Sequence, residues 1–245
     1  TEIRFRGIDN FRAGLPRAIY YNNAPSNNSA DAAADWGYEV TTLYIQDEFN
    51  VSDNLELMAG LRYDRYTSDD SPETNATFLA DYGFSNGITV DGKSLVQPRF
   101  GFTYTLNDRT KVRGGVGLYS GGNPNVWLSN NYSNNNVLQF GQRGRSFGYT
   151  DGSRSLFDAD VVYAGVEAGL PAGPGYGIPQ ELYDAVAGGV GSNFETNYLD
   201  PNSELPSDWK AAIGVTHHID DTLTLQGDLL ITRGDDTAIV QRGDL

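Results

Sequence analysis

Strict alternation of apolar and polar residues is the feature of this chain that most constrains its fold. In residues 55–66, Leu55, Leu57 and Leu61 share one face, while Glu56 and Arg62 lie on the other. A period of two residues is typical of a β-strand whose two faces meet different surroundings. The same alternation predicts six strands, at residues 39–49, 55–66, 97–106, 111–119, 208–219 and 222–233. The chain is therefore expected to be all-β and antiparallel.

Three short connections between these strands repeat one pattern. Residues 51–55 (VSDNL), 106–110 (LNDRT) and 219–223 (IDDTL) each place an aspartate in the middle of the turn. Asn and Asp favour tight turns because they tolerate left-handed backbone and bond to their own main chain. The repeat predicts three consecutive β-hairpins.

The connections between hairpins are long and polar, at residues 67–96 and 120–207. One short helix is expected within them, with Pro179 in its first turn, residues 181–187 as its body and Gly188 at its end. Because short and long connections alternate, all long loops leave the sheet at one end. Outer-membrane β-barrels have this organisation, with short periplasmic turns and long extracellular loops.

A soluble β-sandwich also alternates, so strand length and aromatic placement are needed to separate the two folds. The predicted strands approach the roughly 10 residues that cross a bilayer at barrel tilt. Charge at mid-strand on the polar face suits a wet lumen, at Arg62, Arg99, Arg113 and Asp228. Aromatic residues near strand ends suit the membrane interface; they are Phe49, Tyr63, Tyr66, Tyr104, Tyr119 and Trp209. We therefore predict part of a transmembrane β-barrel.

The charge and composition exclude several classes of protein. A net charge of −15 disfavours binding to nucleic acid, and the absence of cysteine excludes disulfides and thiolate metal sites. No apolar run reaches the roughly 18 residues of a spanning helix. The chain starts at Thr1 within apparent structure, so residues 1–245 are expected to be an internal fragment of one barrel domain.

Several segments resemble TonB-dependent outer-membrane receptors. Residues 44–49 (YIQDEF) with 61–64 (LRYD) resemble one strand pair of that family. Residues 97–104 (QPRFGFTY) and 111–119 (KVRGGVGLY) resemble the next two strands. Residues 120–130 (SGGNPNVWLSN) and 8–14 (IDNFRAG) are similar to the Oar-like branch.

The resemblance implies a barrel of about 22 strands around an N-terminal plug. It also implies a Gram-negative outer membrane as the location, lipid as a neighbour, and uptake of a small nutrient ligand with energy from TonB. Oar-like members are associated with adhesion and protein secretion as well. This sequence lacks a TonB box, a plug and most of the strands, so the resemblance places coupling to TonB in a missing segment and leaves the ligand open.

No catalytic, cofactor or metal site is predicted, and the chain is not expected to be an enzyme. His217 and His218 are adjacent and so point to opposite faces of a strand. The acidic pairs at 69–70 and 158–160 could contact Ca²⁺, but solvated loops are the favoured reading. The glycines at 114–117 lack the spacing of a phosphate loop. The Arg-Gly-Asp triplets at 233–235 and 242–244 are short enough to arise by chance.

The favoured ligand-binding residues follow the fourth strand, where amides and aromatic rings suit sugars or peptides. They are Asn123, Asn125, Trp127, Asn130, Asn131 and Tyr132. Alternatively, Trp127 and Tyr132 anchor the loop. The leading hypothesis is a TonB-dependent receptor segment; the alternatives are an Oar-like adhesion or secretion component and a soluble carbohydrate-binding sandwich.

Overall fold

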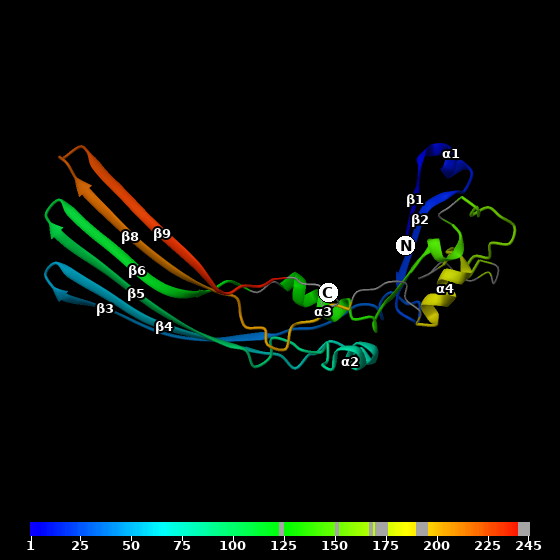
Figure 1. Ribbon diagram of the computed structural model, residues 1–245, viewed down its shortest axis with the longest axis horizontal. Coiled ribbons are helices and arrows are strands. Elements are labelled where there is room, and N and C mark those ends of the chain that lie inside the picture. The colour runs from blue at the N-terminus through cyan, green and yellow to red at the C-terminus, as the bar shows by residue number, and fades with distance from the viewer. Residues whose placement is uncertain (123–124, 150–151, 167–168, 170–175, 190–195, 240–245) are drawn as a thin grey trace. The chain divides into compact units, whose positions relative to one another are not determined.

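The computed structural model describes residues 1–122, 125–149, 152–166, 169, 176–189 and 196–239. The chain forms two compact units, shown in Figure 1. The strand unit comprises residues 37–70, 90–125 and 202–245, and the loop unit comprises residues 1–36, 71–89 and 126–201. Each unit is therefore assembled from three separate stretches of sequence.

A six-stranded antiparallel sheet makes up most of the strand unit, in the order β3-β4-β5-β6-β8-β9. Its strands are β3 (Glu39–Ser52), β4 (Leu55–Thr67), β5 (Ser94–Asn107), β6 (Thr110–Ser120), β8 (Ser207–His218) and β9 (Thr224–Asp236). Each of the six predicted segments coincides with one of these strands, although most strands are longer than the pattern indicated. At 11 to 14 residues, they exceed the roughly 9 to 11 that span a bilayer.

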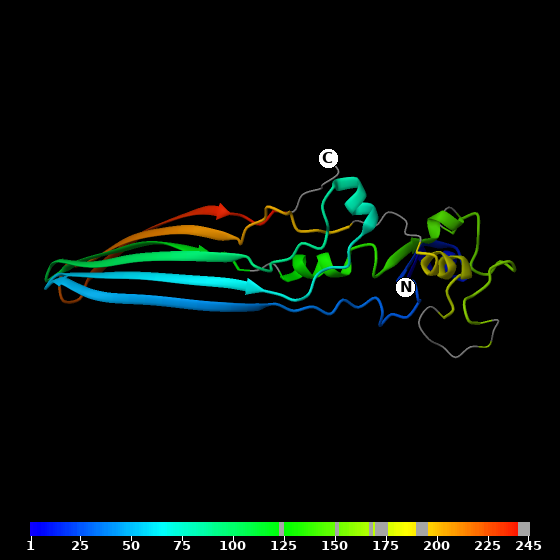
Figure 2. The same cartoon turned by 90° about the horizontal axis from the view of Figure 1, so that it is seen from below.

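Short turns join the strands at one end of the sheet, at the left of Figures 1 and 2. The turn between β8 and β9 is stabilised by Asp220, the residue before the recurring aspartate, which is Asp221 here. Asp220 Oδ1 accepts hydrogen bonds from the backbone N–H groups of Thr222 and Leu223, both at 2.8 Å. The same oxygen accepts from the Thr222 hydroxyl at 2.8 Å. One carboxylate thus satisfies the donors that the reversing chain exposes.

Strand register aligns most apolar residues of the six strands on one face of the sheet, with Leu230, on the polar face, as an exception. Ile45 pairs with Leu61, and Phe102 with Leu57, so apolar side chains meet across neighbouring strands. Ile213 pairs with Leu229 at the far side of the sheet. This apolar face is open: Ile45 is 72% exposed and Leu229 58% exposed. Soluble monomers seldom leave such a continuous apolar surface uncovered.

The register corrects one expectation about the aromatic residues. Phe49, Tyr63, Tyr104 and Trp209 share the apolar face, as residues at a lipid interface must. Tyr66 and Tyr119 lie on the opposite, polar face, because Tyr66 pairs with Val40 and Tyr119 with Asp208. These two tyrosines therefore do not belong to an aromatic girdle on the apolar face, since alternate residues of a strand face opposite ways.

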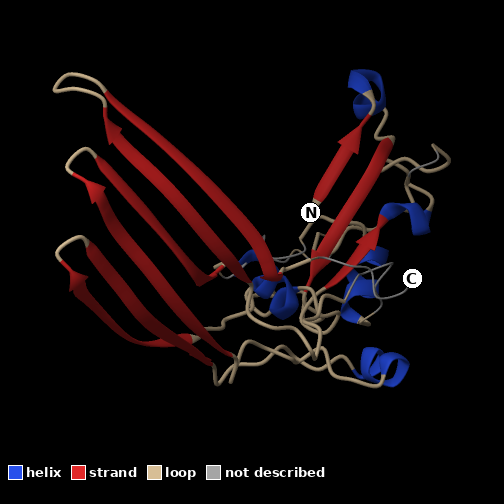
Figure 3. Ribbon diagram, turned by 60° about the vertical axis from the view of Figure 1, so that its left-hand side comes forward, coloured by secondary structure: helices blue, strands red, loops and turns tan. Residues whose placement is uncertain are grey.

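The loop unit contains a second, three-stranded antiparallel sheet in the order β1-β2-β7 (Figure 3). Its strands are β1 (Glu2–Phe5), β2 (Pro16–Asn23) and β7 (Phe140–Arg143). The helices are α1 (Gly7–Arg12), α2 (Ala76–Tyr82), α3 (Asn125–Ser133), α4 (Gln180–Ala187) and the 3₁₀ turn η1 (Gly144–Phe147). Among the described helices, none is both long and apolar enough to cross a membrane.

An apolar core between β2 and α4 stabilises the loop unit. Ile19 and Tyr21 of β2 pack with Leu182 and Val186 of α4, and all four are almost fully buried. Tyr149 lies in the same cluster, and Arg154 stacks over its ring at 4.8 Å. Burial of the Tyr149 hydroxyl raises its pKa well above the ordinary value. The loop unit is thus a folded body with its own interior.

This organisation corrects the expectation that residues 67–96 and 120–207 are loops with one short helix. That helix is present as α4, with Pro179 directly before its first residue and Gly188 after its last. However, α2, α3, η1 and β7 also lie in these stretches. For α2 the signals were visible: the Asn75 side chain caps its first turn, and Gly83 ends it at φ +76°.

Candidate functional site

The polar face of the large sheet carries an organised set of charged and amide side chains. Asp64 is its most buried carboxylate, with a side chain only 4% exposed. It accepts hydrogen bonds from Arg62 Nε at 2.9 Å, the Thr42 hydroxyl at 2.7 Å and Gln97 Nε2 at 2.6 Å. Strands β3, β4 and β5 are therefore linked through one acid.

Gln97 extends this network to a fourth strand. Its other amide atom, Oε1, accepts from the backbone N–H of Ser120 at 3.0 Å, at the end of β6. Because Gln97 donates to Asp64 and accepts from Ser120, its amide orientation is fixed. The Asp64 network, comprising Thr42, Arg62, Asp64 and Gln97, is a rigid feature of the polar face.

A second ion pair lies nearer the turns. Arg113 of β6 donates to Asp228 of β9 at 2.7 Å and to the Thr216 hydroxyl of β8 at 3.1 Å. Both charged side chains are roughly half-exposed. The pair spans β8, and it passes over Gly214 because that residue has no side chain to block it.

Two further cations on this face share one aromatic ring. Arg99 of β5 lies 4.7 Å from the ring centroid of Tyr119, and Lys210 of β8 lies 5.8 Å from the same centroid. Gly117 makes room for this arrangement: a Cβ there would lie 3.0 Å from the Tyr119 ring and 3.2 Å from Arg99 Cγ. We call Arg99, Tyr119 and Lys210 the cation–tyrosine cluster. The two cations and the tyrosine hydroxyl of this cluster are suited to binding polar or anionic groups.

The predicted ligand-binding residues do not form one surface. Asn123 lies outside the described residues. Asn125 and Trp127, at the start of α3, are exposed, and Asn125 accepts a hydrogen bond from the Tyr38 hydroxyl at 2.9 Å. Asn130 is half-buried. A ligand reaching α3 would therefore meet Asn125 and Trp127 first.

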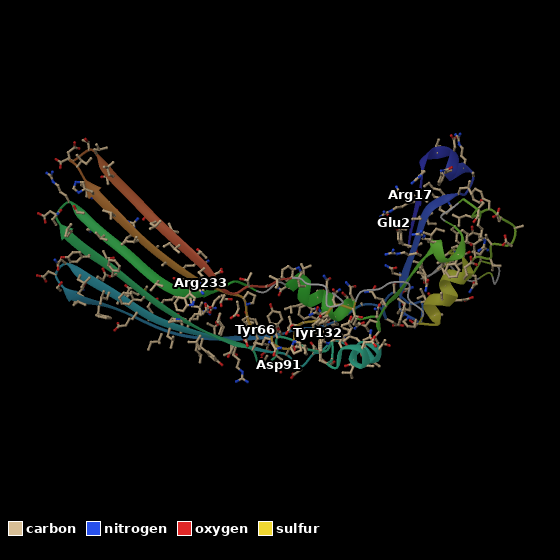
Figure 4. All side chains as sticks on the ribbon, viewed as in Figure 1. Glu2, Arg17, Tyr66, Asp91, Tyr132 and Arg233 are labelled. Carbon is tan, nitrogen blue, oxygen red and sulfur yellow. The ribbon has the colours of Figure 1, made fainter. Side chains whose placement is uncertain are left out.

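The remaining two predicted residues lie on the inner side of α3. Asn131 and Tyr132 are each 7% exposed. The Tyr132 ring stacks on Trp36 with 4.7 Å between centroids and 6° between planes; Figure 4 labels Tyr132. Tyr132 therefore anchors the helix to the loop unit, whereas Trp127 does not.

The two histidines bind neighbouring strands. His217 Nδ1 lies 2.8 Å from the Thr110 hydroxyl, and His218 Nδ1 lies 2.8 Å from the Thr224 hydroxyl. His217 shares the face of Val215 and His218 the face of Thr216, so the two rings lie on opposite faces of β8, as their adjacency predicted. Each ring joins a pair of strands next to the turns.

Acidic residues singled out in the loops have local partners. Asp70 accepts from the Gly37 backbone N–H at 2.8 Å, and Asp158 accepts from that of Ser155 at 2.8 Å. Asp160 pairs with Arg154 at 3.3 Å. Across the described residues, no three acidic, histidine or cysteine side chains gather as a metal site would require.

The glycine run and the Arg-Gly-Asp triplets also have positions in the strand unit. Gly114 lies in β6 beneath the ring of Phe102, where an added Cβ would come within 2.7 Å of Cε1. This glycine therefore accommodates packing on the apolar face. Arg233, Gly234 and Asp235 belong to β9, and residues 242–244 lie outside the described part of the chain.

Sequence reasoning identified the cations of the polar face but not their grouping. Lys210 and Arg99 fall on the polar face by alternation alone. The role of Tyr119 was missed, because its place at a strand end suggested a lipid contact. Its parity within β6, opposite to that of Val116 and Leu118, is the signal that could have revealed it.

Comparison with known proteins gives one match. A family model described as an outer membrane beta barrel domain matches residues 3–235, which is nearly the whole chain. No curated protein and no solved structure matches significantly.

Proposed function

Because the chain belongs to the outer membrane β-barrel domain family and lies in the outer membrane, we propose that it forms part of the wall of a receptor that takes up a nutrient. In this proposal the apolar face contacts lipid, and the polar face lines the path of the solute. The receptor releases the solute to the periplasm with energy from TonB.

The observation that carries the proposal is the difference between the two faces of the large sheet. On one face, Ile45, Leu61 and Leu229 are exposed, and each pairs with an apolar residue of a neighbouring strand. On the other, Asp64 and Asp228 hold arginines by charge-assisted hydrogen bonds. The apolar surface is suited to contact with lipid, and the charged surface is suited to contact with water. The wall of an outer-membrane barrel has lipid on one side and a polar interior on the other.

Strand length and edge structure support the same reading. The six strands form a single meander whose outer strands are β3 and β9. Within the described residues these two strands do not pair with each other. An exposed strand edge in hydrocarbon leaves backbone groups without hydrogen bonds. We infer that β3 and β9 pair with further strands in the complete barrel.

Energy coupling through TonB rests on the resemblance of four strands to TonB-dependent receptors. The substrate class rests on chemistry alone. Asn125 and Trp127 offer an amide and an aromatic face to solvent, which suits an oligosaccharide or a short peptide.

Uptake by living cells tests this proposal. Cells lacking the gene, cells in which TonB is disrupted and complemented cells would be given labelled oligosaccharides and short peptides. Receptor function predicts that uptake of one of these solutes is lost in both mutants and restored by complementation. Unchanged uptake, together with loss of surface attachment or of secreted protein, would contradict transport and favour the adhesion or secretion alternative.

A further inference from the structure

The cation–tyrosine cluster differs from the two arginine–aspartate pairs of the polar face because its cations lack a counter-ion. Arg62 pairs with Asp64, and Arg113 pairs with Asp228. Within the described residues, neither Arg99 nor Lys210 has an acidic partner within 4.0 Å. Two like charges held at one ring repel each other, and an anion between them would remove that repulsion.

The nearest acidic residue by register does not supply this charge. Asp208 pairs directly with Tyr119 across β6 and β8. Its carboxylate lies instead toward β9, where Oδ1 is 3.8 Å from the position a Cβ on Gly234 would take. In a chain with 32 acidic and 17 basic residues, this arrangement leaves a locally positive site.

Arg99 also has an unused donor. Its Nε atom is buried and has no hydrogen-bond partner among the described residues. A buried N–H without an acceptor is unfavourable, so a shift of the Arg99 side chain that brought Nε to an oxygen atom would be stabilising. Guanidinium groups bind carboxylates and phosphates through two parallel hydrogen bonds, and Nε is one of the donors used.

The row of strand residues that contains the two cations has no acidic member. Gly117 lies between Arg99 and Lys210 in the strand register, and Gly60 is the other neighbour of Arg99. The Tyr119 ring and the Arg99 side chain lie over Gly117, and the remaining members of the row, Gln46 and Thr232, are uncharged. An anion approaching along the polar face therefore meets the two cations before it meets any carboxylate in their row.

We propose that Arg99, Lys210 and Tyr119 form a binding subsite for an anionic group, a carboxylate or a phosphate, carried by the solute. Arg99 binds the oxygens through its guanidinium, Lys210 adds a second charge, and the Tyr119 ring holds both cations in place. This inference rests on the proposed function, because it assumes that the polar face meets the solute.

Calorimetry of the full chain in maltoside micelles tests the subsite, with citrate and inorganic pyrophosphate as separate probes. Maltoside carries neither phosphate nor carboxylate, so the detergent does not compete. Arg99→Gln and Lys210→Gln each remove one charge. Lys111→Gln is the matched control, because Lys111 is an exposed cation on the same face near the turns.

We expect each probe to bind the wild type and the control alike, and to bind each of the other two variants roughly tenfold more weakly or worse. Equal affinity in all four proteins, or no binding to the wild type, would overturn the proposal. A heat-dependent shift in gel mobility checks that each variant is folded. If Arg99→Gln does not fold, the affinity of Lys210→Gln still tests the proposal, because the Lys210 side chain is exposed.

A second titration identifies the source of the anion. Added phosphatidylglycerol that displaces the probes from the wild type points to a lipid headgroup, whereas unchanged probe binding points to a free solute. Either outcome supports an anion subsite. This result can be distinguished from that of the uptake assay. If anions do not bind but uptake is intact, only the subsite proposal is overturned. If anions bind but uptake is absent, only the transport proposal is overturned.

Discussion

The carboxylate of Asp228 occupies the space in which a side chain on Gly214 would stand. The two residues pair directly across β8 and β9, and a Cβ on Gly214 would clash with Asp228 Oδ1. The same position lies 3.3 Å from Arg113 Nε. The ion pair between β6 and β9 thus depends on a glycine in the strand between them.

Gly214→Ala is therefore expected to displace the Arg113–Asp228 pair and to destabilise the folded chain by about 1 kcal/mol. Gly227→Ala is the matched control, because a Cβ at that neighbouring β9 position meets nothing within 4 Å. Urea titration in lipid vesicles measures both. Equal stability of the two variants would show that the Arg113–Asp228 pair can rearrange without loss of folding free energy.

Asp64→Asn tests the network that links four strands. The substitution removes the charge that Arg62 and Gln97 share, on a side chain that is nearly fully buried. Since Arg62 is partly exposed and can regain water, we expect a loss of about 2 kcal/mol in the same titration. Glu56→Gln, at an exposed position of β4 on the same face, should change stability by no more than about 0.5 kcal/mol.

The turn formed by Asp220 should depend on pH. Hydrogen bonds from the Thr222 hydroxyl, and from the backbone N–H groups of Thr222 and Leu223, hold the pKa of Asp220 below its ordinary value of 3.8. A carboxyl group with a lowered folded-state pKa stabilises the fold above its unfolded-state pKa. That contribution is lost as the pH falls through the folded-state value.

Hydrogen-exchange protection of the Thr222 and Leu223 amides measures this effect. Protection should be retained at neutral pH and should fall once the pH drops below 3.8. Asp220→Asn keeps an acceptor oxygen but does not titrate, so its protection should not change over the same range. Identical acid sensitivity in both proteins would mean that another group controls the turn.

Trp127 and Tyr132 of α3 should separate binding from folding. Tyr132→Ala removes a buried ring stacked on Trp36 and should cost about 3 kcal/mol of stability. Trp127→Ala changes an exposed ring and should leave stability within about 0.5 kcal/mol, while weakening uptake of the solute. Thermal unfolding and the uptake assay provide the two readouts. Loss of stability in both variants would leave α3 with a structural role only.

Alternation was sufficient to predict the large sheet, for a physical reason. A one-residue slip would move every apolar residue to the wrong face, so residues such as Leu57, Phe102 and Ile213 determine the register by themselves. The aspartates at 53, 108 and 221 mark the turns in the same local way. No long-range information was required.

The loop unit and the grouping of the polar face were harder to predict because they depend on distant contacts. Strand β7 pairs with β2 across more than a hundred residues, and neither is long enough to show a clear period. Helix α3 contains several Asn and Ser residues, which are poor helix formers, so its buried Leu128 and Tyr132 stabilise it instead. The position of Tyr119 near a strand end predicted a contact with lipid, whereas its ring lies beside Arg99 and Lys210.

The orientation of the two faces is the central claim, and adjacent residues of β8 test it most directly. Ala212 lies on the polar face and Ile213 on the apolar face, and both are exposed. Because the chain has no cysteine, Ala212→Cys and Ile213→Cys each carry a single nitroxide label at nearly the same depth. In lipid bilayers, we predict that a water-soluble nickel complex relaxes the label at 212 and that oxygen dissolved in the lipid relaxes the label at 213. Equal or reversed accessibility of the two labels would contradict a wall with lipid on one side and a water-filled path on the other.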